Sequence, residues 1–234
     1  MGPEAHPVAR TASSATVVAV GALAGIRSAA DAALLARLQA RIRGCTTCVE
    51  AGYLDRAAPV IDGRITDRIV IVGQAPGIIE LTTRMPFSGR AGAELRRWLA
   101  RAGIGEADLP YRTSITKCFP GKAPGGGGDR RPSAAEIDLC APWLEAELDL
   151  IRPEIIVLVG TLAIERLWGR AALADVVGRS KRSAARGGAL LIPFPHPSGA
   201  SRWLNDPSNR ARLARGIRLL ARTWRDLQST APRR

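Results

Sequence analysis

Short runs of aliphatic and β-branched residues constrain the fold of this chain more than any other feature. Residues 68–73, 154–160 and 189–193 are almost continuously apolar, and residues 112–117 form a fourth, more mixed run. Such short runs without alternation indicate strands that are buried on both faces, as in a parallel sheet. Helical patterns separate them, at residues 28–43, 91–101, 133–150, 161–168 and 209–227. This alternation predicts an α/β fold with four parallel strands and helices on both faces of the sheet.

The length of 234 residues suits a single domain of this class. We expect a leader over residues 1–27, one domain over residues 28–228 and a tail over residues 229–234. The longest apolar run, Ala15 to Ile26, has 12 residues, which is too short to cross a membrane. It also lacks the basic flank and cleavage site of a signal peptide. We therefore expect a cytoplasmic monomer without a membrane partner.

The charge of the chain is strongly positive and comes almost entirely from arginine. Of 34 Lys and Arg residues 31 are Arg, and with 21 Asp and Glu the net charge is +13. The guanidinium group binds phosphate oxygens in pairs. The excess therefore favours a polyanionic partner, most often a nucleic acid. Arg-rich codon usage that merely solvates the surface is the alternative that composition leaves open.

Four cysteines, Cys45, Cys48, Cys118 and Cys140, form a candidate metal site. The first two make a Cys-x-x-Cys pair in a predicted loop, and the other two lie at element boundaries. Four thiolates hold either a [4Fe–4S] cluster or a tetrahedral zinc ion. The wide spacing of the second two is less typical of a zinc ribbon, and four unligated buried thiols are the third alternative.

Two turns after predicted strands are candidate binding elements. Gly73-Gln-Ala-Pro-Gly77 directly follows the first strand, where open α/β sheets bind ligands. It matches neither a dinucleotide fingerprint nor a P-loop. His196 follows the fourth strand between two prolines, which restrict its backbone. Both turns belong to the same edge of the predicted sheet; an ordinary turn and a structural histidine are the alternatives.

In combination these motifs resemble the family 4 uracil-DNA glycosylases, the iron–sulfur branch of their superfamily, over about residues 44–227. The motifs that carry the resemblance are Cys45-x-x-Cys48, Gly73-Gln-Ala-Pro-Gly77, Pro86-Phe-Ser-Gly-Arg-Ala-Gly92, Lys117-Cys118, Arg131-Pro132 ahead of Cys140, and His196-Pro-Ser198. The resemblance implies a three-layer α/β/α sandwich with a central four-stranded parallel sheet. It also implies a [4Fe–4S] cofactor on Cys45, Cys48, Cys118 and Cys140.

The resemblance further implies a pocket for a base that is flipped out of DNA. His196 would donate a hydrogen bond to uracil O2 as negative charge gathers on the leaving base, and Phe87 would stack on that base. Gln74 would be the second catalytic residue and would orient the water. The implied substrate-binding residues are Ala75, Pro76, Gly77, Phe87 and Ser114, and the implied DNA-binding residues are Ser88, Gly89, Arg90, Ser198 and Arg202.

The chain departs from the family pattern in its candidate pocket. Gln74 stands where the family usually has Glu, and an amide orients water but cannot deprotonate it. Ser114 stands where the family usually has an Asn that reads uracil O4 and N3, so a donor and an acceptor are replaced by one hydroxyl.

The loop after His196 departs as well, because Gly199, Ala200 and Ser201 replace a bulky apolar wedge. Arg202 or Trp203 would then fill the vacated base stack. The self-crosslinking relatives carry a His between the third and fourth cysteines, and this chain has none. We therefore expect turnover and not a covalent trap.

These observations predict a monofunctional enzyme that removes uracil from DNA and leaves an abasic site. A glycosylase for another deaminated base, such as hypoxanthine or xanthine, is the alternative within the class. A non-catalytic iron–sulfur protein that binds damaged DNA is the alternative from another class.

Overall fold

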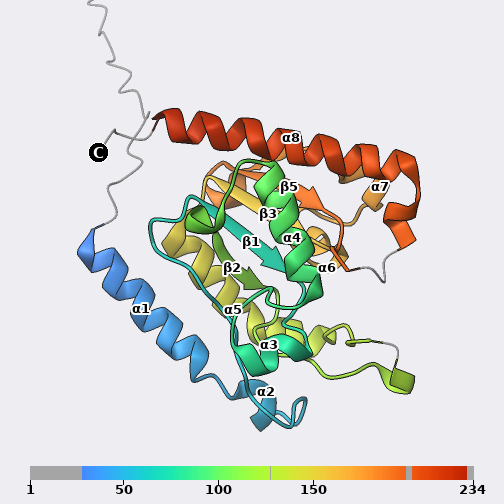
Figure 1. Ribbon diagram of the computed structural model, residues 1–234. Coiled ribbons are helices and arrows are strands. Elements are labelled where there is room, and N and C mark those ends of the chain that lie inside the picture. The colour runs from blue at the N-terminus through green and yellow to red at the C-terminus, as the bar shows by residue number, and fades with distance from the viewer. Residues whose placement is uncertain (1–27, 127, 199–201, 231–234) are drawn as a thin grey trace, which may run out of the picture.

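The computed structural model describes residues 28–126, 128–198 and 202–230 (Figure 1). Its centre is a five-stranded sheet with the strand order β2-β1-β3-β5-β4. The strands are β1 (Ile69–Gly73), β2 (Tyr111–Ser114), β3 (Ile155–Val159), β4 (Lys181–Ser183) and β5 (Ala189–Phe194). The four predicted strands are parallel, which confirms the α/β fold.

The predicted count of four strands is wrong, because β4 adds an antiparallel edge strand beside β5. Its three residues are polar and mostly exposed, so the sequence carries no apolar run there. An edge strand of this kind is held by main-chain hydrogen bonds to one neighbour, which hydropathy does not reveal.

Two helical layers cover the sheet, one on each face (Figure 1). Apolar side chains from α4 (Arg90–Arg101) and α8 (Pro207–Thr230) share one core with alternate residues of the strands. Helices α1 (Ala29–Arg43), α5 (Ala134–Ile151), α6 (Thr161–Leu167) and α7 (Leu173–Val176) share the other core with the remaining strand residues. The predicted three-layer α/β/α sandwich is therefore confirmed.

Local sequence signals set the helix boundaries. Ser28 and Ser133 are the N-caps of α1 and α5, and each forms a capping box with the acidic residue three positions later. Three short helices were not predicted, α2 (Thr47–Glu50), α3 (Ile78–Thr83) and α7. Cys48 therefore lies in a helix and not, as predicted, in a loop.

The predicted strand over residues 112–117 is shorter than expected and ends at Ser114. Beyond it, the N–H groups of Ile115 and Thr116 donate to the carbonyls of Gly73 and Gln74. The chain thus leaves the sheet together with the turn after β1. This main-chain pairing brings the two turns to the same place.

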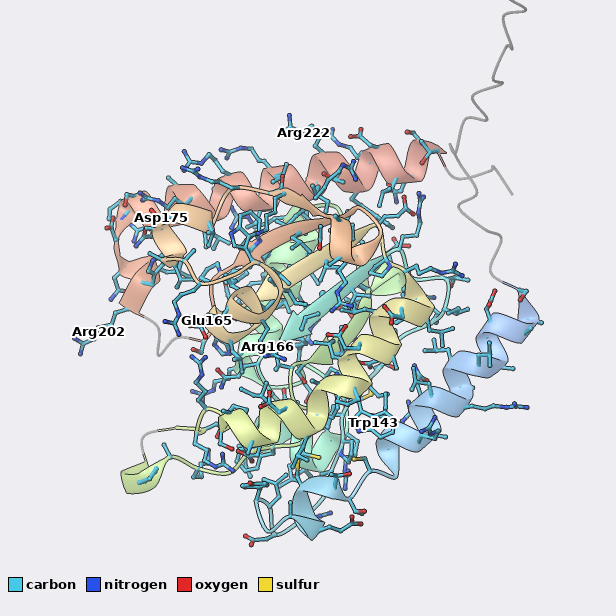
Figure 2. The ribbon with its side chains drawn as sticks, turned by 180° about the vertical axis from the view of Figure 1, so that it is seen from behind. Trp143, Glu165, Arg166, Asp175, Arg202 and Arg222 are labelled. Carbon is cyan, nitrogen blue, oxygen red and sulfur yellow. The ribbon has the colours of Figure 1, made fainter. Side chains whose placement is uncertain are left out.

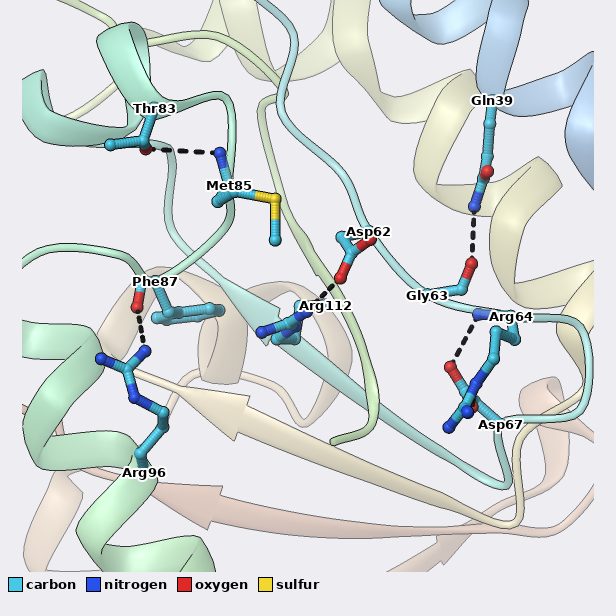
Figure 3. A network of polar contacts seen from close by, with 10 residues as sticks. All are labelled: Gln39, Asp62, Gly63, Arg64, Asp67, Thr83, Met85, Phe87, Arg96 and Arg112. Atoms are coloured by element: carbon cyan, nitrogen blue, oxygen red, sulfur yellow. Dashed lines mark hydrogen bonds and ion pairs between the residues drawn. The ribbon is translucent and has the colours of Figure 1, made fainter. Parts of the chain in front are cut away.

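The outer edge of β2 is covered by the segment that leads into β1 (Figure 3). Asp62 forms an ion pair and a main-chain bridge with Arg112, and Gln39 of α1 donates to the Gly63 carbonyl over 3.0 Å. Covering this edge satisfies main-chain groups that would otherwise be open to pairing with other chains.

A buried ion pair fastens α5 to the end of β2. Lys117 Nζ lies 2.7 Å from a carboxylate oxygen of Glu147, and both side chains are at most 1% exposed. Tyr111 and Thr113 donate their hydroxyls to the same carboxylate over 2.8 and 2.9 Å, and Lys117 also donates to the Ser114 carbonyl. The charges are thus compensated by a complete hydrogen-bond network.

The leader predicted for residues 1–27 and the loop residues Gly199 to Ser201 lie outside the described residues. Within the described part of the chain, no helix is long and apolar enough to span a membrane. The single domain over residues 28–228 stays a prediction.

We predict that Glu147→Ala lowers the free energy of unfolding by about 3–5 kcal/mol, because it leaves the Lys117 ammonium buried without its partner. Denaturant unfolding followed by circular dichroism measures this loss. Adding Lys117→Met to that variant should recover part of the stability, since the uncompensated charge is then removed. A Glu147→Ala variant as stable as the parent chain would contradict this account of the network.

Candidate active site and cysteine pocket

A cleft of about 420 Å³ opens at the carboxyl ends of the parallel strands. Its wall includes Gly73 at the end of β1, Ser114 at the end of β2, Val159 at the end of β3, and His196 beyond β5. The chain passes from β1 to one neighbour, β2, and later to the other, β3, so this edge is the switch point of the sheet. Open α/β sheets bind their ligands at such a point.

Most of the predicted site residues meet in this cleft. The lining includes both predicted catalytic residues, all five predicted substrate-binding residues and three of the predicted DNA-binding residues: Gln74, His196, Ala75, Pro76, Gly77, Phe87, Ser114, Gly89, Arg90 and Ser198. Ser88 and Arg202 are not among its lining residues.

Glu80, which the sequence analysis did not single out, joins the two turns of the cleft. Its side chain lies in α3 and is buried. One carboxylate oxygen accepts from the N–H of Gly77 over 3.0 Å, and the other accepts from the N–H of Gly89 over 2.9 Å. A single carboxylate thus fixes the spacing between the 73–77 turn and the 86–92 turn. The sequence signal for Glu80 was weak. Glu80 supplies one half of a capping box three residues after Gly77, but a glycine N-cap has no side chain to supply the other half.

Phe87 is held in a left-handed backbone conformation, with φ of 55°. Such a conformation costs energy for a residue with a side chain and persists only where its surroundings fix it. Arg96 of α4 donates to the Phe87 carbonyl over 2.9 Å (Figure 3). Gly92 packs so closely beneath that a Cβ there would lie 1.6 Å from the same carbonyl oxygen. The backbone conformation that positions the Phe87 ring therefore depends on α4.

His196 stands at the mouth of the cleft, beside the end of β3. A Cβ on Gly160 would lie 3.4 Å from its ring, so the glycine leaves room for the imidazole. The Ser198 N–H donates to Nδ1 over 3.3 Å. Nδ1 is therefore the acceptor, and in the neutral ring Nε2 carries the proton. His196 is exposed at the surface, and the partial loss of solvent around it lowers the pKa of the imidazole, against a smaller opposing effect of the Asp129 charge.

The polar groups of the cleft are partly committed to other contacts. Ser114 Oγ donates to the Thr116 carbonyl over 2.8 Å, so it faces the cleft only as an acceptor. The Gly89 amide is bound to Glu80, and the Ser88 hydroxyl shares a 2.6 Å hydrogen bond with Thr83. Arg202 projects from the rim of the molecule into solvent (Figure 2). The roles assigned to these residues stay predictions.

The four cysteines converge on a second, small pocket beside the first. Cys45 follows α1, Cys48 lies in α2, Cys118 follows the β2 segment and Cys140 lies in α5, and all four line the same cavity. Burial, aided by the neighbouring thiols, raises the pKa of Cys48 to about 11. Burial likewise raises the pKa of Cys118 to about 12. Thiols placed together in this way disfavour the thiolate unless a cation compensates them.

Two N–H groups point at sulfur atoms of this pocket. The Lys117 amide donates to Cys140 Sγ over 3.2 Å, and the indole N–H of Trp143 donates to Cys45 Sγ over 3.3 Å. Hydrogen bonds of this kind orient and stabilise thiolate ligands. The donor set therefore fits an inorganic group held by sulfur.

Among the described residues, no group of three or more His, Cys, Asp or Glu side chains is arranged as a metal site.

Comparison with known proteins agrees with this site. The family model of the uracil DNA glycosylase superfamily matches residues 61–228. A Type-4 uracil-DNA glycosylase of Thermotoga maritima is 33% identical over 159 residues, covering 68% of this chain and 78% of the relative. A Type-4 uracil-DNA glycosylase of Pyrobaculum aerophilum is 31% identical over 175 residues, covering 72% and 85%.

A Type-5 uracil-DNA glycosylase of Pyrobaculum aerophilum is 34% identical over a shorter stretch of 116 residues. The chain belongs to the uracil-DNA glycosylase superfamily, and the predicted resemblance is confirmed. Within that superfamily, it is similar over most of its length to the Type-4 enzymes.

We predict that the His196 ring titrates below its ordinary pKa of 6.5 and stays neutral at pH 7, protonated on Nε2. Nitrogen-15 NMR of the imidazole measures both the pKa and the position of the proton. The assignment is simple, because His6 is the only other histidine in the sequence. The imidazole in the unfolded chain binds a proton near pH 6.5, whereas the folded protein binds it only at lower pH. Lowering the pH through 6.5 should therefore also destabilise the fold. A pKa above 6.5, or a proton on Nδ1, would contradict the geometry.

Proposed function

We propose that this protein is a DNA-repair glycosylase that hydrolyses the N-glycosidic bond of uracil in DNA and leaves an abasic site. One observation carries the proposal: the 73–77 turn, Phe87 and His196 meet in one cleft of the size of a base-binding pocket, in a chain of this superfamily. One chain supplies the whole cleft, so we propose that it acts as a monomer.

The geometry supports a mechanism in which the flipped base stacks on Phe87. As the bond between the base and C1′ breaks, negative charge gathers on the pyrimidine and positive charge on the sugar. A neutral His196 with its proton on Nε2 would donate to uracil O2 and stabilise that negative charge. The side chain of Gln74 would orient the attacking water.

Ser114 bears on the choice of base. Because its hydroxyl proton is committed to the Thr116 carbonyl, only its lone pairs face the cleft. An acceptor at this point suits the N3–H of uracil and opposes the bare N3 of cytosine. It also suits the ring N–H of hypoxanthine or xanthine, so we expect selection for deaminated bases with less preference among them than an Asn provides.

Binding to the DNA backbone would come from the positive charge. A net charge of +13 supplies a sequence-independent attraction to phosphate. Arg90 and Ser198 line the cleft and would contact the phosphates next to the flipped nucleotide. Arg202, whose side chain projects into solvent (Figure 2), would contact the DNA backbone farther from the cleft.

We further propose that Cys45, Cys48, Cys118 and Cys140 hold a [4Fe–4S] cluster. The shared pocket and the N–H groups directed at sulfur support a group held by thiolates, and the resemblance to the family 4 enzymes favours a cluster over a single zinc ion. When bound, the cluster would act as a structural crosslink. The four residues would then tie α1, α2 and α5 to the segment after β2.

The activity is tested with duplexes that contain one uracil, hypoxanthine or xanthine, followed by alkaline cleavage at abasic sites. We expect cleavage at uracil, and His196→Ala should lower the rate about 10²–10³-fold while DNA affinity changes little. Cleavage only at hypoxanthine or xanthine would show that the protein is a glycosylase for one of these deaminated purines and not for uracil. Intact strands with all three duplexes, from cluster-loaded protein, would leave a damaged-DNA binder and overturn the glycosylase.

The cofactor is tested by metal and sulfide analysis of protein purified without oxygen. We expect about four iron and four sulfide per chain with absorbance near about 400 nm, and Cys140→Ser should lose most of the iron. One zinc per chain without sulfide would overturn the cluster.

A further inference from the structure

The cleft contains a carboxylate, that of Asp129, which no sequence motif connected with it. Gln74 stands where the family usually has Glu, so the 73–77 turn offers no group that takes a proton from water. Asp129, from the glycine-rich segment between β2 and α5, lines the same cleft as Gln74 and His196. More than fifty residues of sequence separate it from either of them.

Main-chain hydrogen bonds hold Asp129 in place. Lys122 and Asp129 form an antiparallel bridge. On either side of it, the Ala123 N–H donates to Gly128 over 2.8 Å and the Arg130 N–H donates to Gly121 over 3.0 Å. The loop is thus paired with itself at its base.

Arg130, the residue after Asp129, fastens the paired loop to α5. Both terminal nitrogens of Arg130 bind the carboxylate of Glu136 at 2.6 and 2.7 Å, in the first turn of α5. Glu136 also caps that helix by accepting from the Ser133 N–H. Bidentate pairs of this kind fix geometry as well as charge. Asp129 is therefore placed by a fixed neighbour.

The two carboxylate oxygens of Asp129 differ in their contacts: Oδ1 accepts a hydrogen bond, and Oδ2 faces the 73–77 turn. Oδ1 accepts from Lys122 Nζ over 2.7 Å. Oδ2 lies 3.0 Å from the point that a Cβ on Gly77 would occupy, against the turn that carries Gln74. Its charge also acts on His196 across the cleft. The other carboxylate in the lining, Glu80, has both oxygens bound by main-chain N–H groups.

We propose that Asp129 is a catalytic carboxylate of this site and accepts a proton from the attacking water, the step that the amide of Gln74 cannot perform. This inference rests on the proposed glycosylase activity. The bond between C1′ and the base nitrogen breaks and its electron pair leaves with uracil. The water oxygen bonds to C1′ and its proton passes to Asp129 Oδ2. Solvent then takes that proton from Asp129 and supplies one to the uracil anion.

The test measures uracil release in single turnover, with protein in excess over a uracil duplex, together with DNA affinity. Asp129→Asn should lower the rate about 10²-fold or more without weakening the affinity. Adding Gln74→Glu should raise the rate of Asp129→Asn at least ten-fold, because it returns a carboxylate to the cleft, in the turn next to residue 129. Asp138→Asn, on the exposed face of α5, removes the same charge and should match the parent chain.

Three results separate the alternatives. An Asp129→Asn variant as fast as an active parent chain would overturn the inference and leave the glycosylase standing. A loss that Gln74→Glu does not repair, matched by an equal loss in Lys122→Gln, would show that Asp129 only orders its loop and would also overturn it. A parent chain that releases no uracil would overturn the proposed function itself.

Discussion

The cleft depends on one carboxylate that bridges two turns. Glu80 accepts the N–H groups of Gly77 and Gly89, and so sets the distance between the turn that follows β1 and the turn that carries Phe87. Because both turns contain glycine at the contact, their main chains approach the carboxylate directly. The stack for a base and the wall opposite it are therefore parts of one hydrogen-bonded unit, and neither turn would keep its place without the other.

The base cleft and the cysteine pocket share one segment of chain. Thr113 and Ser114 line the cleft, and Lys117 and Cys118, a few residues later, line the cysteine pocket. The Lys117 side chain is bound to Glu147 of α5, while its N–H donates to Cys140 of the same helix. Since α5 also holds Arg130 through Glu136, one helix positions the sulfur ligands, the end of β2 and the loop of Asp129.

Sequence patterns predicted what depends on local chemistry. Apolar runs placed β1, β3 and β5 to within a residue or two, and the capping box at Ser133 placed the start of α5. The edge strand β4 was missed because it buries nothing. The bridging role of Glu80 could not be predicted, since it depends on how the 86–92 turn folds back onto α3. The position of Asp129 could not be predicted either, since it depends on the fold that brings it to Gly77, more than fifty residues earlier in the chain.

The central claim is that the cleft at the sheet edge receives a base flipped from DNA. A crystal structure with a duplex that carries 2′-fluoro-2′-deoxyuridine tests it most directly, because the fluorine slows bond cleavage and preserves the bound nucleotide. We expect the uracil ring to stack on Phe87, with His196 Nε2 within hydrogen-bond distance of O2. A uracil that remains stacked in the duplex, with the DNA bound on another face of the protein, would contradict it.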